Sequence, residues 1–491
     1  MILVGTPSLV WSLRILAFFS CTLSVANPAP TPEARLEKLT PEAVQNSASQ
    51  HYPLIQAALR DVAKASAELL SAQGGFDPQV KLDATHTPYG YYQNTFLDAT
   101  IEQPTPFLGT KFIARYRLGQ GDFASYDGKL ATFSGGEVYG GVELPLLRGN
   151  SIDERRGKLQ TSERGLQMAQ ASLLSQRIEI ERQATIKYWE WAAAGKKLEI
   201  ARSMVKVAQD RDQALGSRVK QGDAPVFEKS DNERTILQRQ SAEVASQRAL
   251  QKAALELSLF YRSSDGNPQV PLPAQLPEAL PEPSKEQTAE LQKTTEDLMV
   301  TYVARNPELR RLDRQVSQTE VELKLSENLV LPKLNLKVGG TLDLGVANVP
   351  KFLVPTDYPG ELKVSLNFEM PLLLRSPRGR QQSTQASLDR LQSILQLQRD
   401  RVRTAITDAQ QAIEWSLKRV ELAKKELLLA KSLEAGERTR FFHGDSNLLF
   451  VNIREQNTWE AALKQIDTLL EFQKAQADFK AAISELDESK S

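Results

Sequence analysis

The feature that most constrains the fold of this chain is a tandem repeat. Two segments, 143–147 and 369–373, have almost the same sequence, Glu-Leu-Pro-Leu-Leu and Glu-Met-Pro-Leu-Leu. Beyond them the two halves match at a constant offset of 222 residues, which places Gly222 on Gly444. Matches that recur in one order mark a duplicated structural unit. Each half is therefore expected to fold into the same succession of elements.

Both halves follow one plan: a helical stretch, a β segment, and two long helices separated by a turn. A connector with six prolines divides the halves, and Pro-rich connectors behave as semi-rigid spacers. The predicted organisation is a signal peptide (1–26), repeat 1 (27–261, with a β-hairpin region at 78–147 and a helical hairpin at 153–261), the linker (262–300), and repeat 2 (301–487, with a β-hairpin at 332–373 and a helical hairpin at 378–487).

The predicted helices are unusually long. No proline interrupts residues 153–215, and some 60 residues of helix reach roughly 90 Å. Apolar residues recur there every seven positions, as in the series Ala184, Trp191, Leu198 and Val205. A strict seven-residue repeat predicts helices that coil around their neighbours. Taken alone, these helices favour a soluble coiled coil.

The β segments have a different pattern, strict alternation of apolar and polar residues. Residues 333–346 and 361–370 each place apolar side chains on one face and polar ones on the other. Such strands would need a second layer in a soluble core, whereas in lipid their edges are satisfied only if a barrel closes. The pattern therefore favours an outer-membrane β-barrel built from several chains. The positions expected to face lipid are Leu334, Leu336, Val338, Leu362, Val364, Leu366 and Phe368.

The N-terminus contains the only long apolar stretch of the chain. Residues 15–26 follow Arg14 and end in a small-x-small sequence at Ala26. This arrangement is typical of a cleaved secretory signal and is too short to span a bilayer. Lipidation of Cys21 is an alternative. Either interpretation predicts an exported protein.

Composition argues against catalysis and against nucleic-acid binding. Lys plus Arg and Asp plus Glu both total 61, so the net charge is zero and there is no basic footprint for nucleic acid. Three distant histidines and one cysteine exclude a Cys/His zinc site and an intrachain disulfide. No catalytic Ser/His/Asp grouping or phosphate-binding glycine loop is present. We expect no enzyme activity, no cofactor and no metal.

With these features in place, the sequence resembles the TolC family of outer-membrane efflux proteins, the outer membrane factors. The resemblance rests on Arg-Asn-Pro-Glu-Leu-Arg at 305–310, on the Pro-Leu-Leu after each β segment, and on the turns at Gly222 and Gly444. It implies a homotrimer whose long helices form a periplasmic α-barrel. Four strands per chain would continue this as a 12-stranded outer-membrane β-barrel, so the fold class is mainly α with β.

The resemblance also implies a function and partners. The expected function is a passive exit channel of a tripartite efflux or type I secretion system, conducting small molecules or proteins from the periplasm to the exterior. The implied partners are a periplasmic adaptor protein, an inner-membrane transporter reached through that adaptor, and outer-membrane lipid. The alternative is an envelope-spanning structural tether without transport, although a tether needs no polar lumen.

In this family the turns between the long helices form the closed aperture and the adaptor's docking surface. An Asp commonly follows the glycine by six residues, whereas here Glu228 and Phe450 occupy those places. The departure predicts a mixed gate in which phenylalanines narrow the passage. The resemblance assigns aperture and docking roles to Arg218, Gly222, Asp223, Glu228, Arg440, Phe441, Phe442, Gly444, Asp445 and Phe450.

Repeat 1 departs from repeat 2 in the length of its β segment. The excess, residues 90–130, contains further strand-like stretches at 96–102 and 111–118. Two interpretations stay open: an external hairpin or loop, or additional strands in the barrel wall.

Overall fold

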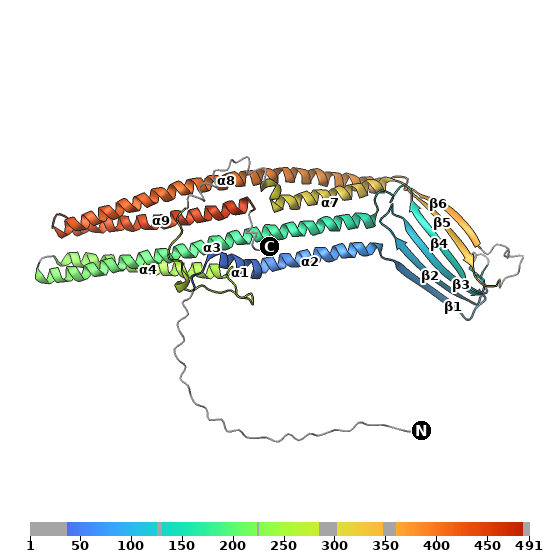
Figure 1. Ribbon diagram of the computed structural model, residues 1–491, viewed down its shortest axis with the longest axis horizontal. Helices are drawn as coiled ribbons and strands as arrows, with labels where there is room; N and C mark the ends of the chain where they lie inside the picture. The colour runs from blue at the N-terminus through green and yellow to red at the C-terminus, as the bar shows by residue number, and fades with distance from the viewer. Residues whose placement is uncertain (1–36, 125–129, 223–224, 284–301, 347–359, 485–491) are drawn as a thin grey trace, which may run out of the picture.

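The computed structural model describes residues 37–124, 130–222, 225–283, 302–346 and 360–484. Long helices run along most of the molecule and a sheet forms one end (Figure 1). The signal peptide predicted at 1–26, with Cys21, lies outside the described residues. In chain order the elements are α1 (Pro41–His51), α2 (Pro53–Gln73), η1 (Gly74–Phe76), β1 (Gln79–Thr87), β2 (Asn94–Pro104), β3 (Lys111–Gly121), β4 (Glu137–Pro145), α3 (Glu154–Gln221), α4 (Val226–Ser258), η3 (Pro273–Gln275), α7 (Pro307–Val330), β5 (Lys333–Asp343), β6 (Gly360–Glu369), α8 (Arg375–Phe442) and α9 (Leu448–Ala482).

The two halves have closely matching elements. Helices α3 and α8 each contain 68 residues, which corresponds to roughly 100 Å. Helices α4 and α9 contain 33 and 35 residues. The first strand of each half starts directly after a proline, Pro78 or Pro332, because proline cannot continue the preceding helix. The two repeats therefore match in the lengths of their long helices as well as in the order of their elements.

The core lies where helices of both halves cross in the middle of the molecule. It is formed by α1, the start of α2, α3, α4, α8 and α9 and contains the fully buried side chains of Trp191 and Phe472. The seven-residue series from Ala184 to Val205 is buried throughout. Tyr188 is also buried and donates its hydroxyl hydrogen to the carbonyl oxygen of Leu39 at 2.7 Å. Apolar periodicity therefore selects the faces by which these helices pack.

The predicted linker is attached to the helices over its described part, residues 262–283. Leu280 is buried in the central core. The N–H of Leu39 donates to the carbonyl oxygen of Gln275 at 3.0 Å. Lys424 of α8 pairs with Glu282 at 2.7 Å. This segment therefore crosses the bundle in contact with it rather than spanning a gap.

The six strands of the described residues form one antiparallel sheet in the order β1-β2-β3-β4-β5-β6. The expectation of four strands per chain was wrong, because the excess segment of repeat 1 supplies β2 and β3 within the sheet. Three such chains would contribute six strands each, 18 in place of the expected 12. The number four was implied by the resemblance to the TolC family, whereas the strand-like stretches at 96–102 and 111–118, left open from sequence, lie within β2 and β3.

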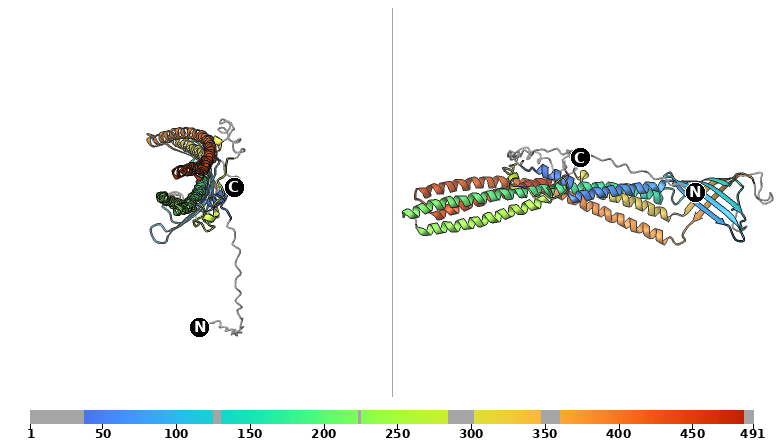
Figure 2. Two further views of the ribbon diagram at one scale, coloured as in Figure 1. Left: turned by 90° about the vertical axis from the view of Figure 1, so that its left-hand side faces the viewer. Right: turned by 90° about the horizontal axis from the view of Figure 1, so that it is seen from below.

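The molecule is curved in cross-section. Seen along its length, the helices lie on an arc (Figure 2). The sheet extends this arc as a single layer beyond the helix ends (Figures 1 and 2). Among the described residues, β1 pairs only with β2 and β6 only with β5, so the sheet of one chain is open at both edges. One chain thus forms a section of curved wall.

Candidate functional site

The end of the molecule opposite the sheet is formed by two helical hairpins. The α3–α4 hairpin turns at Gly222 and the α8–α9 hairpin at Gly444, with φ of 81° and 82°. Only glycine adopts this left-handed conformation without steric cost, which explains its presence at both turns. The N–H of Gly222 donates to the carbonyl oxygen of Val219 at 3.1 Å, and the N–H of Gly444 to that of Phe441 at the same distance.

Several predicted tip residues take part in ordinary turn structure. The N–H of Asp445 donates to the carbonyl oxygen of Arg440 at 2.9 Å, and the Arg440 guanidinium donates to that of Asp445 at 3.2 Å. Glu228 lies half-buried in the first turn of α4. Asp223, the remaining acidic residue predicted here, lies outside the described residues.

The structure brings the two tips together through an arginine and a phenylalanine. The Arg218 guanidinium of α3 lies 5.7 Å from the centre of the Phe441 ring of α8, within the range of a cation–π contact. Phe441 in turn lies edge-on to Phe442, with ring centres 6.5 Å apart. Phe442 itself is 85% exposed. Arg218 and Phe441 were both predicted from sequence to lie at the aperture, and within one chain they are neighbours.

Phe450 lies apart from these rings. It belongs to the first turn of α9, where its N–H donates to the Asn447 side chain at 3.1 Å, and it is 52% exposed. Phe441 and Phe442 line a cavity of about 680 Å³ between the hairpins, and Phe450 is not among the described residues that line it. Its side chain is therefore available to contacts outside its own chain.

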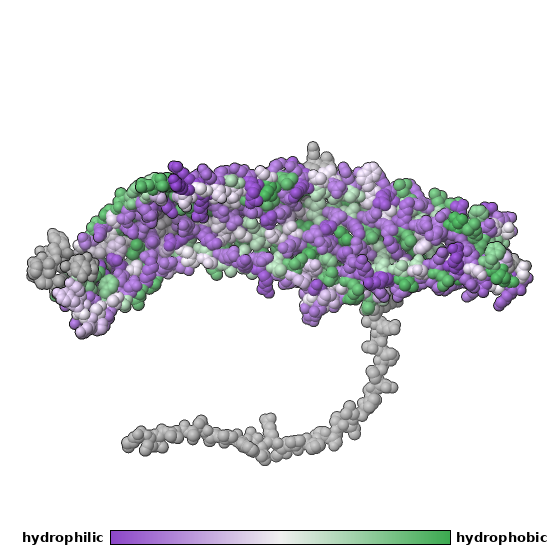
Figure 3. Space-filling view, turned by 180° about the vertical axis from the view of Figure 1, so that it is seen from behind, coloured by the Kyte–Doolittle hydropathy of each residue, from purple (hydrophilic) through white to green (hydrophobic). Residues whose placement is uncertain are grey.

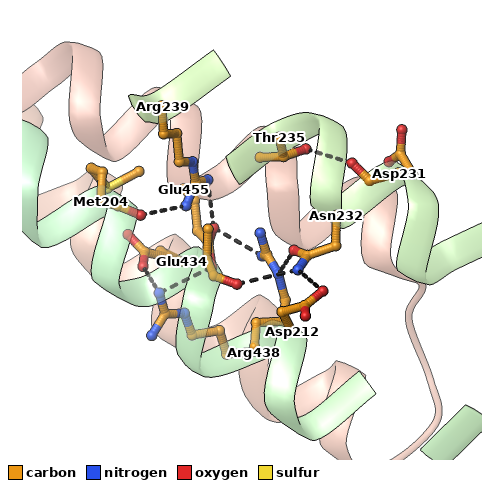
Figure 4. A network of polar contacts seen from close by, with 11 residues as sticks. Met204, Asp212, Asp231, Asn232, Thr235, Arg239, Glu434, Arg438 and Glu455 are labelled. Carbon is orange, nitrogen blue, oxygen red and sulfur yellow. Dashed lines mark hydrogen bonds and ion pairs between the residues drawn. The ribbon is translucent and has the colours of Figure 1, made fainter. Parts of the chain in front are cut away.

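Deeper in the hairpins, a single buried carboxylate joins four helices (Figure 4). Glu455 of α9 is only 2% exposed. One of its oxygens accepts hydrogen bonds from Arg211 of α3 at 2.9 Å and from Arg239 of α4 at 2.8 Å. The other accepts from Arg438 of α8 at 3.1 Å. Counting from the start of α9, this cluster lies about 10 Å from the turn.

The surrounding groups fix the arginines in place. Arg239 also donates to the carbonyl oxygen of Met204 at 3.0 Å, and Arg211 to the side chain of Asn232 at 2.8 Å. Asn232 is fully buried and donates to Asp212 at 3.1 Å. Burial, opposed by Glu455, lowers the pKa of Arg211, yet a guanidinium remains charged at any physiological pH. The cluster thus holds the α8–α9 hairpin against the α3–α4 hairpin.

Sequence analysis missed this cluster because charged residues on helices were taken to be solvated. A signal was nevertheless present. Glu455 follows the buried Leu448 and Val451 at the spacing of an inward helical face, and Asn232 and Arg239 lie seven residues apart on α4. A charge in an apolar series requires a partner, because an unpaired buried charge is costly.

At the other end, the sheet separates apolar from charged residues by face. All seven positions expected to face lipid lie on one face, as the pairing of Leu336 with Leu366 and of Val338 with Val364 requires. Leu366 is 61% exposed. In Figure 3, green hydrophobic side chains gather over the sheet and again towards the helical tips.

The opposite face of the sheet carries ion pairs between neighbouring strands. Arg117 pairs with Glu137 at 2.9 Å, and Lys337 with Glu143 at 3.3 Å. Towards the sheet edge Lys81 pairs with Glu102 at 3.0 Å. A sheet with one apolar face and one charged face, which no other described element covers, suits an environment of lipid on one side and water on the other.

The described residues contain neither a metal cluster nor a helical span. No group of three or more His, Cys, Asp or Glu side chains among them is placed to hold a metal ion. None of the described helices is both long and apolar enough to cross a membrane.

No protein-family model matches the sequence, and no curated protein matches it. Several solved structures, in contrast, have a similar fold. The outer-membrane channel CmeC of Campylobacter jejuni gives a TM-score of 0.62 at 11% identity, covering 97% of this chain and 96% of that one. The MtrE outer-membrane channel of Neisseria gonorrhoeae, in its open state, gives 0.61 at 12% identity, covering 90% and 88%. The chain has the fold of an outer-membrane channel.

A third structure supports the same assignment. The outer membrane protein VceC of Vibrio cholerae gives a TM-score of 0.61 at 12% identity, covering 90% of this chain and 96% of that one. The resemblance to the TolC family noted from sequence is therefore confirmed for the fold. Because the identity is this low over nearly the full length, the comparison extends to the fold and not to individual side chains.

Proposed function

We propose that the chain is one subunit of a homotrimeric outer-membrane exit channel that passively conducts molecules from the periplasm to the exterior. The observation that carries the proposal is the single-layer sheet with its apolar and ion-paired faces, continued by an arc of helices (Figure 2). A wall of this kind separates lipid from a water-filled lumen. The fold shared with CmeC and MtrE, both described as outer-membrane channels, supports it.

Assembly from several chains follows from the open sheet. Unpaired backbone groups along β1 and β6 would each cost several kcal/mol in lipid. Pairing β1 of one copy with β6 of the next removes both edges, and the curved wall of each chain fits a closed ring. The number three comes from the TolC resemblance.

The proposed partners follow from the absence of an energy source in a passive duct. We place the chain in a tripartite efflux pump or a type I secretion system, where an inner-membrane transporter supplies the energy and a periplasmic adaptor links it to the channel. The adaptor would dock at the hairpin tips, where exposed Phe442 and the turns at Gly222 and Gly444 lie.

Single-channel recording of the purified protein in planar bilayers tests the proposal. A channel is expected to give discrete conductance steps. A structural tether with the same long helices would give none, so silent bilayers containing correctly inserted, folded protein would favour the tether.

The gate is proposed to be mixed, apolar and charged, at the hairpin tips. Phe450 is exposed within its own chain and free to meet its copies at the axis of a trimer, where three phenylalanines would resist wetting. We expect Phe450→Ala to raise the resting conductance more than Glu228→Ala does. Unchanged conductance in both variants would place the constriction elsewhere.

A further inference from the structure

Repeat 1 contributes four strands to the sheet, and repeat 2 contributes two among its described residues. The additional strands, β2 and β3, are not appended at an edge. They are inserted between β1 and β4, so that the two strands corresponding to the hairpin of repeat 2 no longer touch. An external loop would leave β1 and β4 as neighbours.

The inserted strands are paired with each other along their whole length and with β1 and β4 over most of it. Residues 79–87 of β1 pair with 94–102 of β2, and all of β2 pairs with all of β3. Residues 111–117 of β3 pair with 137–143 of β4. The backbone of this hairpin is thus satisfied within the sheet, as a strand in the hydrocarbon region of a membrane requires.

The inserted strands also keep the two faces of the sheet separate. On the apolar face, Ile101 lies between Val80 and Ala114, and Phe112 lies beside Val142. On the opposite face the ion pairs continue without a break across both strands. Glu102 pairs with Lys81 and Lys111, Asp98 with Arg115, and Glu137 with Arg117.

The width of the helical wall fits six strands better than four. Four helices reach the sheet side by side in the order α2, α3, α7 and α8. At 8–10 Å per helix they span about 32–40 Å. Strands about 4.8 Å apart and tilted by about 40° cover about 38 Å if there are six, and about 25 Å if there are four.

We propose that β2 and β3 are wall strands and that they widen the outer-membrane mouth of the channel for bulky, hydrated cargo. This inference rests on the proposed trimeric channel. Barrel diameter grows roughly in proportion to strand number, so 18 strands give a mouth about one and a half times as wide as 12. The ion-paired lining presents water-soluble cargo with a polar surface instead of an apolar one.

Size-graded labelling from outside the cell tests the width. Lys337→Cys places a thiol on the charged face of β5, reached from outside only through the mouth. Intact cells are treated with polyethylene-glycol maleimides of increasing size. The comparison is the same cysteine in a chain lacking residues 90–134, which joins β1 to β4 through a four-residue turn, Pro88-Tyr89-Gly135-Gly136, and retains four strands.

The largest reagent that labels Lys337→Cys is expected to be smaller by about one third in radius after the deletion, as the ratio of 12 to 18 strands predicts. An equal size limit in both chains would overturn the inference and leave the channel intact. Failure of even the smallest maleimide to label the full-length chain would instead contradict the proposed water-filled channel. The unsubstituted chain is the labelling control.

A measurement on the full-length chain covers the case in which the deletion variant fails to fold. Phe112→Trp and Ile113→Trp place an indole on opposite faces of β3, and the fluorescence of the native tryptophans is subtracted as background. In brominated-lipid vesicles, fluorescence from Phe112→Trp is expected to be quenched and that from Ile113→Trp preserved. Quenching of both indoles by aqueous iodide and of neither by lipid would show that the hairpin lies outside the wall.

Discussion

At the scale of single residues, Glu455 matters because three arginines, each from a different neighbouring helix, share its carboxylate. The side chains of Arg211 and Arg239 have little contact with water, so their positive charges are neutralised mainly by the Glu455 carboxylate. Removing one partner from such a group leaves uncompensated buried charge, which typically costs 3–5 kcal/mol. The cluster therefore couples the two hairpins more strongly than exposed ion pairs would.

We expect Glu455→Gln to lower the free energy of unfolding of the helical section by about 3 kcal/mol, because it leaves the arginines unneutralised. Denaturant unfolding followed by helical circular dichroism measures the change. The matched control is Glu414→Gln, which removes an exposed carboxylate paired with Lys418 of the same helix and should cost less than about 1 kcal/mol. Equal losses in the two variants would contradict a special role for Glu455.

Leu366 tests the polarity of the sheet. It lies mid-strand on the apolar face, opposite Leu336. Replacing it with Arg would place a charge in lipid and should cost roughly 2–4 kcal/mol of stability. Asn367→Arg, one position along and on the charged face, should be tolerated and should change the single-channel conductance. The reverse pattern, seen in refolding titrations and bilayer recordings, would mean that the register is shifted by one residue.

At the scale of elements, an ion-pair chain ties α3 to α4 and α9 at the molecule's middle. Glu190 accepts from Lys474 at 2.6 Å and from Lys187 at 2.9 Å, and Lys187 also donates to Glu256 at 2.8 Å. Burial alone would raise the pKa of the Glu190 carboxyl, but the two lysines outweigh it and hold that pKa below its ordinary value. The folded state therefore favours the ionised carboxyl.

This linkage predicts a pH dependence with a definite sign. A carboxyl with a lowered pKa stabilises the fold above its ordinary pKa, about 4.3, and loses that contribution as the pH falls through the lowered value. Glu190→Gln should therefore destabilise the bundle at pH 7, with the difference from the natural chain shrinking below about pH 4. Unfolding midpoints at pH 7 and pH 3 measure it. Glu199→Gln, whose partner Lys196 is on the same helix, is the control for losing a carboxylate that joins no second helix.

The elements also show how far sequence reasoning reaches. The long helices and both glycine turns were predictable because heptads and left-handed turns leave strong local signals, as at Gly222 and Gly444. The place of β2 and β3 was left open, because strand pairing depends on residues distant in sequence. The partners of Glu455 were out of reach for the same reason: the spacing after Leu448 and Val451 marks Glu455 as inward-facing, but the three arginines that neutralise it lie on three other helices.

At the scale of the whole molecule, one chain is incomplete. The open edges at β1 and β6 and the uncovered apolar face both require further copies or lipid. We expect no stable folded monomer in detergent. Light scattering together with circular dichroism checks this, and a monodisperse monomer with full β content would contradict it.

The equal length of α3 and α8 has a further consequence. The two helices are equally long and both hairpins end at the same end of the molecule, so the length of the helical section is set once in each repeat (Figure 1). Removing one heptad from each of α3, α4, α8 and α9 should shorten the particle by about 10 Å, measurable by electron microscopy, with every packing face preserved. Removing heptads from one hairpin alone should leave the tips at Gly222 and Gly444 at different heights along the molecule. Any lengthening of the helices in evolution would therefore have had to occur in both repeats together. A partner that docks at the hairpin tips would have had to change with them.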